Sequence, residues 1–161
     1  MICNREPAPL RETRDAIRED AAAVTHLFRT TFAATYAYFA NLHTPEEDLA
    51  HFQKVLQSNH TVVVEKDGEI AGFCAFTPGW VNYLYVLPKY QGSGIGSRLL
   101  HQAKSENAEL QLWTFQQNQK ARNFYERHGF KPVEETDGAG NEEKQPDVRY
   151  VWKRILVETK T

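Results

Sequence analysis

The feature that most constrains the fold of this chain is a strand, a glycine-rich turn and a helix that follow one another directly. The segment Val81–Val86 is rich in β-branched and aromatic residues, and Pro88 ends it because proline cannot continue a ladder. Gly92, Gly94 and Gly96 then permit backbone angles and close approaches that a Cβ would forbid. After them, apolar side chains recur at helical spacing, at Ile95, Leu99, Leu100 and Ala103.

Such a junction favours binding of a phosphate or pyrophosphate, because unpaired backbone N–H groups meet the positive end of a helix dipole. A Walker loop is excluded, since Gly96 is followed by Ser97 and Arg98 instead of Lys and Ser or Thr. The dinucleotide pattern G-x-G-x-x-G also fails, because its last position falls on Ser97 or Leu99. On the glycines alone, a β–α turn without a ligand stays an equal alternative.

A second motif lies downstream, beyond one predicted helix and one predicted strand. It reads Asn118-x-x-Ala121-x-x-Phe124-Tyr125-Glu126-x-x-Gly129-Phe130. Asn118 is expected to cap a helix, and Gly129 to end it. The predicted buried face of that helix comprises Ala121, Phe124, Tyr125 and His128.

Together the two motifs resemble the GNAT superfamily of N-acetyltransferases. The pattern Q-x-x-G-x-G from Gln91 to Gly96 is similar to the family's acyl-CoA loop, and the second motif is similar to N-x-x-A-x-x-x-Y-E-x-x-G-F. The resemblance covers roughly Thr61 to Trp152, and more weakly the chain from Arg14. It implies an α/β (α+β) fold, with a mixed, mostly antiparallel central sheet of about six to seven strands flanked by about four helices.

The resemblance also implies a site for acetyl-CoA as cosubstrate, with no metal and no covalent enzyme intermediate. By this likeness the backbone of Leu84 holds the thioester oxygen, Asn118 contacts the pantetheine or acetyl end, and Tyr125 is the general acid. The pantetheine arm would lie along Leu84, Tyr85 and Val86. The pyrophosphate would be held by Gln91, Gly92, Ser93, Gly94, Ile95, Gly96 and Ser97. As alternatives, Tyr125 is a core aromatic and Asn118 only a helix cap, although capping and cofactor contact are compatible.

The acceptor side is less sharply marked. Tyr36 lies in an aromatic segment that lines the acceptor site in the family, although core packing also explains such aromatics. The acids Glu142, Glu143 and Asp147 suggest a cationic substrate such as a polyamine, an aminoglycoside-like amine or a peptide N-terminus.

The general base is left open by the sequence. Some family members place a Glu early in the strand before the glycine loop, but Trp80, Asn82 and Tyr83 supply no acid here. An amine with a pKa near 10.4 must still lose a proton. The candidates are Glu142, Glu143, Asp147, His43 or a chain of waters.

The remaining elements follow from local signals. Thr44 with Pro45 predicts a helix start, and Asp67-Gly68 predicts a hairpin turn. The full prediction is a strand near 10–16, a helix from 19, a helix from 45, strands at 61–65, 70–76 and from 80, a helix to about 107, a strand at 109–114, a helix from 118, a strand from 130, a loop at 136–145 and a last strand at 147–155.

Composition bounds the class of protein. A chain of 161 residues with 41% hydrophobic residues suits a single domain, 1–161, with residues 1–9 as a loose leader. A net charge of −2 with interspersed signs argues against a nucleic-acid partner. No apolar run reaches membrane-spanning length, and the first residues do not resemble a signal peptide. Cys3 and Cys74 are predicted to be free thiols in a reducing cytoplasm, and Cys74 has no His partner that would make it a nucleophile.

We therefore expect an acetyl-CoA-dependent N-acetyltransferase that acetylates a primary amine of a small molecule or peptide by direct attack in a ternary complex. One alternative is a non-catalytic acyl-CoA sensor of the same fold. Another is a transferase that uses a longer acyl-CoA or a hydroxyl acceptor. A homodimer is possible, since dimers are common in the family.

Overall fold

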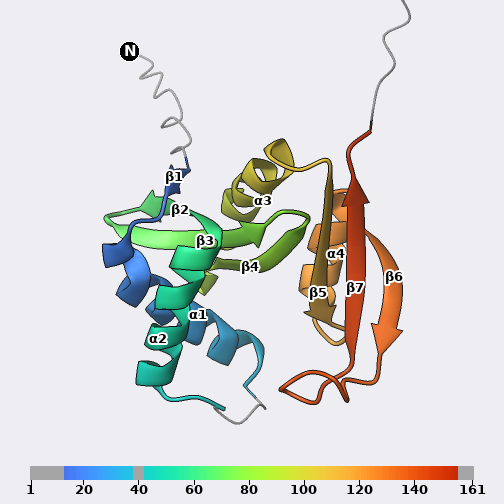
Figure 1. The fold of residues 1–161 in the computed structure, drawn as a ribbon, viewed down its shortest axis with the longest axis horizontal. Helices are drawn as coiled ribbons and strands as arrows, with labels where there is room; N and C mark the ends of the chain where they lie inside the picture. The colour runs from blue at the N-terminus through green and yellow to red at the C-terminus, as the bar shows by residue number, and fades with distance from the viewer. Residues whose placement is uncertain (1–12, 38–41, 156–161) are drawn as a thin grey trace, which may run out of the picture.

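One mixed sheet organises the molecule (Figure 1). The computed structural model describes residues 13–37 and 42–155. Its seven strands lie in the order β1-β2-β3-β4-β5-β7-β6, and every neighbouring pair is antiparallel except β4 and β5. The strands are β1 (Arg14–Asp15), β2 (His60–Lys66), β3 (Glu69–Thr77), β4 (Trp80–Val86), β5 (Glu109–Phe115), β6 (Lys131–Thr136) and β7 (Asp147–Lys153). The helices are α1 (Ala21–Thr35), α2 (Pro45–Ser58), α3 (Ile95–Ser105) and α4 (Gln119–Arg127). The predicted fold class is thus confirmed.

Strand β3 is the centre of the core, because helices cover it on both faces. Phe73 points to one face, where its ring centroid lies 5.8 Å from that of Phe52 in α2. Gly72, the neighbouring residue, faces α3 on the other side, where an added Cβ would lie 3.0 Å from Ile95 and from Leu99. The absence of a side chain at Gly72 therefore lets α3 pack directly on the sheet.

The sheet separates between β4 and β5. These two parallel strands pair at a single position, Trp80 with Gln111, and the Gln111 N–H donates to Gly79 O at 2.8 Å. From that point β5, β7 and β6 turn away from β4, as Figure 1 shows. The rest of β4 therefore presents one backbone edge that no neighbouring strand covers.

Several local predictions are confirmed. Asp67 and Gly68 form the tight turn between β2 and β3 with φ angles of 53° and 79°. The Thr44 side chain accepts from the Glu47 N–H at 3.1 Å, and Pro45 occupies the first helical position. The turn and the helix cap each depend only on residues next to them in the sequence, so the sequence is enough to predict them.

The beginning of the chain differs in part from its prediction. Of the strand expected near 10–16, residues up to 12 lie outside the described part, and within that part the strand is only Arg14–Asp15. It is short because the Ile17 N–H donates to the Asp20 carboxylate at 2.8 Å and starts a 3-10 turn. The aromatic segment that contains Tyr36 continues α1 to Thr35, and residues 38–41 also lie outside the described part.

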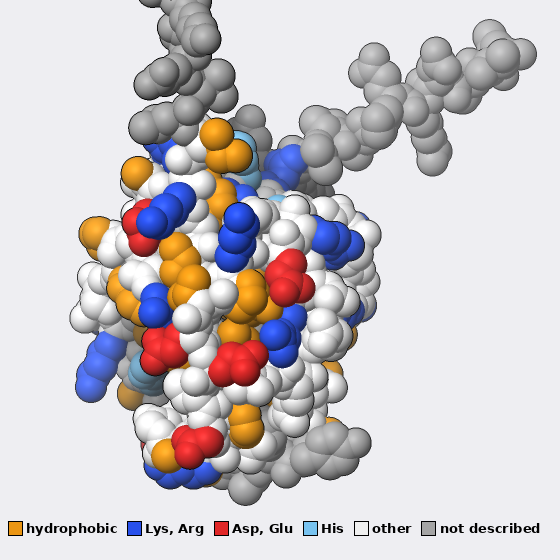
Figure 2. Space-filling view, turned by 90° about the vertical axis from the view of Figure 1, so that its right-hand side faces the viewer, with side chains coloured by type: hydrophobic (Ala, Val, Ile, Leu, Met, Phe, Trp, Pro, Cys, Tyr) orange, Lys and Arg blue, Asp and Glu red, His pale blue; other side chains and the backbone are white. Residues whose placement is uncertain are grey.

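The outer face carries mixed charge. Figure 2 views the molecule from the β6 side of Figure 1, and acidic and basic side chains alternate there. Arg149 of β7 and Glu134 of β6 form one such pair at 3.0 Å. Among residues 13–37 and 42–155, no helix combines the length and the apolar character that crossing a bilayer requires.

We predict that Gly72→Ala destabilises the fold by about 1–3 kcal/mol, because the new methyl group must push α3 away from β3. Its Cβ would also lie 3.1 Å from Tyr85 O, in β4. Chemical denaturation measures the effect. Gly140→Ala is the matched control, since a Cβ at Gly140 meets nothing within 4 Å. Equal stability of the two variants would contradict this account of the packing.

Candidate active site

The glycine loop between β4 and α3 has the geometry of an anion cradle. Gly92 and Gly94 have φ angles of 81° and 87°, and an added Cβ would meet nothing within 4 Å at either position. Gly94 is the N-cap of α3, so the N–H groups of Ile95, Gly96 and Ser97 have no carbonyl one turn earlier to bond. These N–H groups can therefore serve a ligand.

The uncovered edge of β4 borders the same space. The Leu87 N–H donates to Ala71 O in β3 at 2.8 Å. Because N–H directions alternate along a strand, the backbone polar groups of Leu84 and Val86 point the other way, toward the gap between β4 and β5. Gln91 confirms this direction, since its Nε2 reaches Val86 O at 3.0 Å from the loop side.

A cavity of about 650 Å³ fills the gap between the glycine loop, β4 and α4. It brings together most residues of the predicted cofactor site. The side chains of Ser93 and Ile95 are exceptions, because Ser93 bonds back to Tyr90 O and Ile95 is buried in the core. The predicted residues that line the cavity are Leu84, Tyr85, Val86, Gln91, Gly92, Gly94, Gly96, Ser97, Asn118 and Tyr125.

Basic side chains at the cavity were not found by the sequence reasoning. Lys120, Arg127 and His128 line it, and Lys120 Nζ donates to Gln91 Oε1 at 2.6 Å. His128 is oriented by Phe124 O at 2.7 Å from its Nδ1, and its Nε2 lies 2.9 Å from Ser97 Oγ. The Lys120–Gln91 and His128–Ser97 contacts join residues 29 and 31 positions apart, so no local sequence pattern predicts them. The positive charges of Lys120 and Arg127 suit a phosphate-bearing ligand.

Tyr125 is buried in α4 with its ring against Phe124 and Phe130, at centroid distances of 5.3 Å and 5.6 Å. Burial raises the pKa of its phenol, so the group stays protonated at neutral pH. In the described part of the chain, the only fully buried side-chain polar atom without a hydrogen bond is Thr61 Oγ1. The Tyr125 hydroxyl also has no hydrogen bond within the described residues, but it is not fully buried. It is therefore open to the cavity that Tyr125 lines.

Asn118 caps α4 and contacts the predicted acceptor residue Tyr36. Its Oδ1 accepts from the Ala121 N–H at 3.1 Å, which confirms the cap, and its Nδ2 donates to Tyr36 Oη at 2.7 Å. Burial raises the pKa of Tyr36, and hydrogen bonds from Asn118 and Thr114 oppose that shift. The contact links the end of α1 to the start of α4 across the cavity.

A second cavity, of about 800 Å³, adjoins the first. All four predicted acceptor residues line it, which are Tyr36, Glu142, Glu143 and Asp147. Five residues line both cavities and so mark their junction, which are Tyr36, Tyr83, Tyr85, Trp113 and Thr114. The two cavities therefore adjoin at these side chains.

Most carboxylates of the second cavity are engaged. Asp48 pairs with Arg29 at 2.5 Å, Asp147 accepts from Asn141 at 3.2 Å and from Thr136, and Glu142 pairs with His43. Glu143 differs, because within residues 13–37 and 42–155 its half-buried carboxylate has no hydrogen bond or ion pair. Its charge contributes to raising the pKa of the junction tyrosines Tyr36, Tyr83 and Tyr85.

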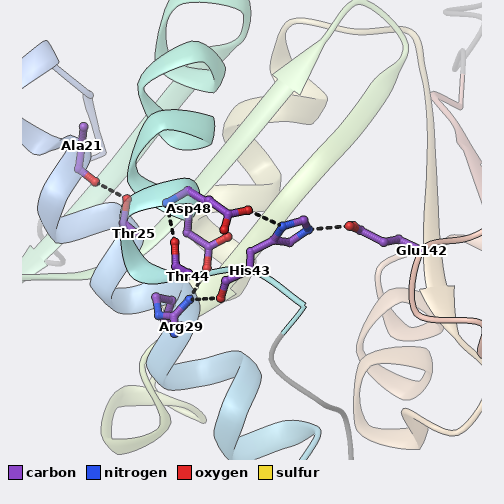
Figure 3. A network of polar contacts seen from close by, with 8 residues as sticks. Ala21, Thr25, Arg29, His43, Thr44, Asp48 and Glu142 are labelled. Atoms are coloured by element: carbon purple, nitrogen blue, oxygen red, sulfur yellow. Dashed lines mark hydrogen bonds and ion pairs between the residues drawn. The ribbon is translucent and has the colours of Figure 1, made fainter.

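His43 ties two distant loops together at this cavity (Figure 3). It precedes α2, and its Nδ1 lies 3.3 Å from Glu47 while its Nε2 contacts Glu142 in the connection between β6 and β7. Both carboxylates, Glu47 first, raise the pKa of the His43 imidazole. The Glu142 contact could not be predicted from local sequence, because it joins residues 99 positions apart.

Two further groups bear on the chemistry. Cys74 is buried in β3, and burial raises its pKa to about 12, so its thiol is a poor nucleophile at neutral pH. Cys3 lies outside the described residues. No group of three or more His, Cys, Asp or Glu suited to a metal ion is found in the part of the chain that the structure describes.

Comparison with known proteins identifies the class. Residues 57–132 match the family described as acetyltransferase (GNAT) domain. The N-acetyltransferase YhfO of Bacillus subtilis, itself uncharacterised, is 32% identical over 136 residues, or 73% of this chain and 88% of that protein. This chain therefore belongs to the GNAT family of acetyltransferases.

Two more comparisons give a shorter match and a shared fold. The peptidyl-lysine N-acetyltransferase YiaC of Escherichia coli is 36% identical over 73 residues, or 45% of this chain and 50% of that protein. The PaiA N-acetyltransferase of Thermoplasma acidophilum, solved in complex with coenzyme A, has a TM-score of 0.65 and 23% identity, with 89% of this chain and 98% of that chain covered. The fold drawn in Figure 1 is thus similar to that of a protein solved in complex with coenzyme A.

We predict that His43 titrates above the ordinary histidine value of about 6.5, because protonation strengthens both of its carboxylate contacts. A raised folded-state pKa means that this contribution to stability is complete below pH 6.5 and is lost as pH rises through the folded-state value. NMR of the imidazole measures the titration. Glu47→Gln and Glu142→Gln should each lower the pKa, whereas Glu46→Gln, on the same first turn of α2, should not. A pKa at or below 6.5 in the unaltered chain would contradict the bridge.

Proposed function

We propose that this chain transfers the acetyl group of acetyl-CoA to a primary amine of a small molecule or peptide, by direct attack in a ternary complex. The observation that carries the proposal is the single pairing of β4 with β5, at Trp80 and Gln111. It leaves the Leu84–Val86 edge open beside a glycine loop, in a cavity of about 650 Å³.

The residues at this cavity fit coenzyme A. The loop offers helix N–H groups and left-handed glycines to a pyrophosphate, with Lys120 and Arg127 nearby to balance its charge. Gly96 also lines the cavity, and a Cβ there would make an ordinary contact with the Phe124 ring, at 3.4 Å. The open edge of β4 suits the amide groups of a pantetheine arm, which would add to the sheet as a further strand does.

Bound acetyl-CoA supplies an activated thioester. The Leu84 N–H is the donor we assign to the thioester oxygen, where it stabilises developing negative charge. Tyr125 holds a phenol proton in reach of the cavity, and burial raises its pKa, so the group is protonated at neutral pH and has a proton to donate. Asn118 fixes Tyr36 and the start of α4, and so holds the wall opposite β4.

The second cavity is the acceptor site in this proposal. Glu143 brings an unneutralised carboxylate to a cavity whose wall is largely aromatic, a combination that favours a cationic amine. The YiaC protein is named for peptidyl-lysine, and the lysine side chain is an amine of this kind. A reducing cytoplasm as the place of action and a homodimer stay predictions.

Acetyl-CoA should raise the midpoint of thermal unfolding by roughly 5–10 °C at a hundred times its dissociation constant, since such binding stabilises by about 2.7 kcal/mol. NADH and ATP serve as controls, and neither should change the midpoint of thermal unfolding. Coenzyme A release in the presence of amines then measures transfer. The assignment of the cavity fails if acetyl-CoA at saturating concentration leaves the midpoint unchanged.

Tyr125→Phe should lower kcat about 100-fold or more and leave acetyl-CoA affinity within about twofold, because only the proton donor is removed. Tyr150→Phe is the matched control. It deletes another core hydroxyl, on a ring 6.4 Å from that of Tyr125, and Tyr150 lines neither cavity. If Tyr125→Phe retains full turnover, a non-catalytic role for this tyrosine is indicated.

Glu143→Gln should raise KM for the accepted amine about tenfold and leave KM for acetyl-CoA unchanged, because the carboxylate lines only the acceptor cavity. Glu134→Gln, on the exposed strand β6, is the control, because it removes the same charge at a residue that lines neither cavity. An unchanged amine KM in Glu143→Gln would remove this residue from the acceptor site.

A further inference from the structure

The junction of the two cavities holds a polar pair that the proposed function does not yet use. Tyr83 of β4 lines both cavities, and its Oη lies 2.6 Å from Nε2 of His51 in α2. The two rings meet at a centroid distance of 5.9 Å. Tyr83 is thus placed where the amine and the thioester would meet, with an imidazole directly behind it.

The surroundings of Tyr83 keep it from acting alone as a base. Burial, followed by the charges of Glu143, Asp48 and Glu142, raises the pKa of its phenol. A phenolate at this position is therefore disfavoured. The Tyr83 oxygen can still take a proton on one side if it gives its own proton to His51 on the other.

His51 is suited to the outer end of such a path. It lies on the exposed side of α2, so a proton that reaches its imidazole can pass to water. Imidazoles exchange protons near neutral pH, where a primary amine with a pKa near 10.4 is almost entirely an ammonium ion. His51 thus connects Tyr83, at the junction of the two cavities, to solvent.

We propose that Tyr83 and His51 relay the proton of the acceptor ammonium to solvent, a role that rests on the proposed function. The ammonium N–H bond breaks as Tyr83 Oη takes its proton. In the same step the Tyr83 O–H bond breaks and a new N–H bond forms at His51 Nε2. The imidazolium then releases a proton to water, and the neutral amine keeps the lone pair that attacks. Tyr83 is the catalytic residue, and His51 is a positioning residue that acts through it.

The charged and titratable neighbours of the pair come from every element around it. The negative groups belong to α2, to the β6–β7 connection and to the start of β7, and the positive ones to α1 and to His43, two residues before α2. In order along the chain the charged and titratable groups are Arg29, Tyr36, His43, Glu47, Asp48, Tyr85, Glu142, Glu143 and Asp147. Of the carboxylates, Glu47, Asp48 and Glu142 are in ion pairs and Asp147 accepts hydrogen bonds, so Glu143 is the rival proton acceptor that the experiment must separate from His51.

The experiment compares His51→Gln, Tyr83→Phe, their double variant and Glu143→Gln with the unaltered chain. Coenzyme A release is measured from pH 5.5 to 9.5 with three probes, namely a peptide with one internal lysine, spermidine and butylamine. His101→Gln is the control, because His101 is an exposed histidine of α3 that lines neither cavity. Acetyl-CoA binding is followed separately by thermal shift.

The relay predicts that kcat/KM falls tenfold or more at pH 7 in His51→Gln and in Tyr83→Phe. The deficit should shrink toward pH 9.5, where free amine is abundant, and the double variant should be no slower than either single one. Acetyl-CoA binding and the control should be unchanged. In ¹⁵N NMR spectra of the unaltered chain, Nε2 of neutral His51 should carry no proton, because it accepts from Tyr83.

Three results would overturn the relay. In the first, the unaltered chain acetylates a probe and both variants keep its pH profile, so that only the relay fails and the proposed function stands. In the second, Glu143→Gln alone removes the acid limb of the profile, and the proton acceptor is then Glu143. In the third, none of the probes is acetylated although acetyl-CoA binds, and the proposed transfer to amines fails together with the relay.

Discussion

The structure depends on the separation of β4 from β5. Two parallel strands that pair at only one position leave backbone groups without strand partners along their facing edges, and a folded protein usually provides other hydrogen-bond partners for such groups. Here that edge lines a cavity whose floor is the N-terminus of α3 and whose far wall is α4. Gly72 positions the N-terminus of α3 beside this edge, because the lack of a side chain at Gly72 lets α3 lie against β3 at van der Waals distance. The open edge is thus held by the core and is not a local irregularity of one strand.

The second cavity is built on a different principle. Helices α1 and α2 press an aromatic cluster against β4, with Phe28 in contact with Tyr85 at a centroid distance of 5.1 Å and Phe52 with Tyr83 at the same distance. Tyrosines from this cluster form the junction of the two cavities, and carboxylates approach it from loops. Aromatic packing therefore fixes the junction, while polar groups at its rim, tied by His43, determine its charge.

The sequence predicts the parts of this design that are local. The Thr44 cap, the Asp67-Gly68 turn and the β4–loop–α3 junction each depend on neighbours within a few residues, and the motif around Asn118 and Tyr125 places α4. Contacts between distant segments could not be read in this way. Glu142 reaches His43 across 99 positions and Tyr83 reaches His51 across 32, and neither pair has a spacing that a helix or strand repeats. The gap beside β4 cannot be derived from the residues alone, because strand identity does not reveal where two strands stop pairing, although the family resemblance implies a ligand along Leu84, Tyr85 and Val86.

Amide hydrogen exchange, resolved by residue and recorded with and without acetyl-CoA, tests whether the cofactor lies along the open edge of β4. The Leu84 and Val86 N–H groups face the gap, whereas the Tyr85 N–H faces β3 by the alternation that Leu87 fixes. The account predicts that acetyl-CoA slows exchange at Leu84 and at Gly94–Ser97 tenfold or more, with little change at Tyr85, which is protected already. Binding of acetyl-CoA with unchanged exchange at these positions would place the cofactor elsewhere and contradict the account.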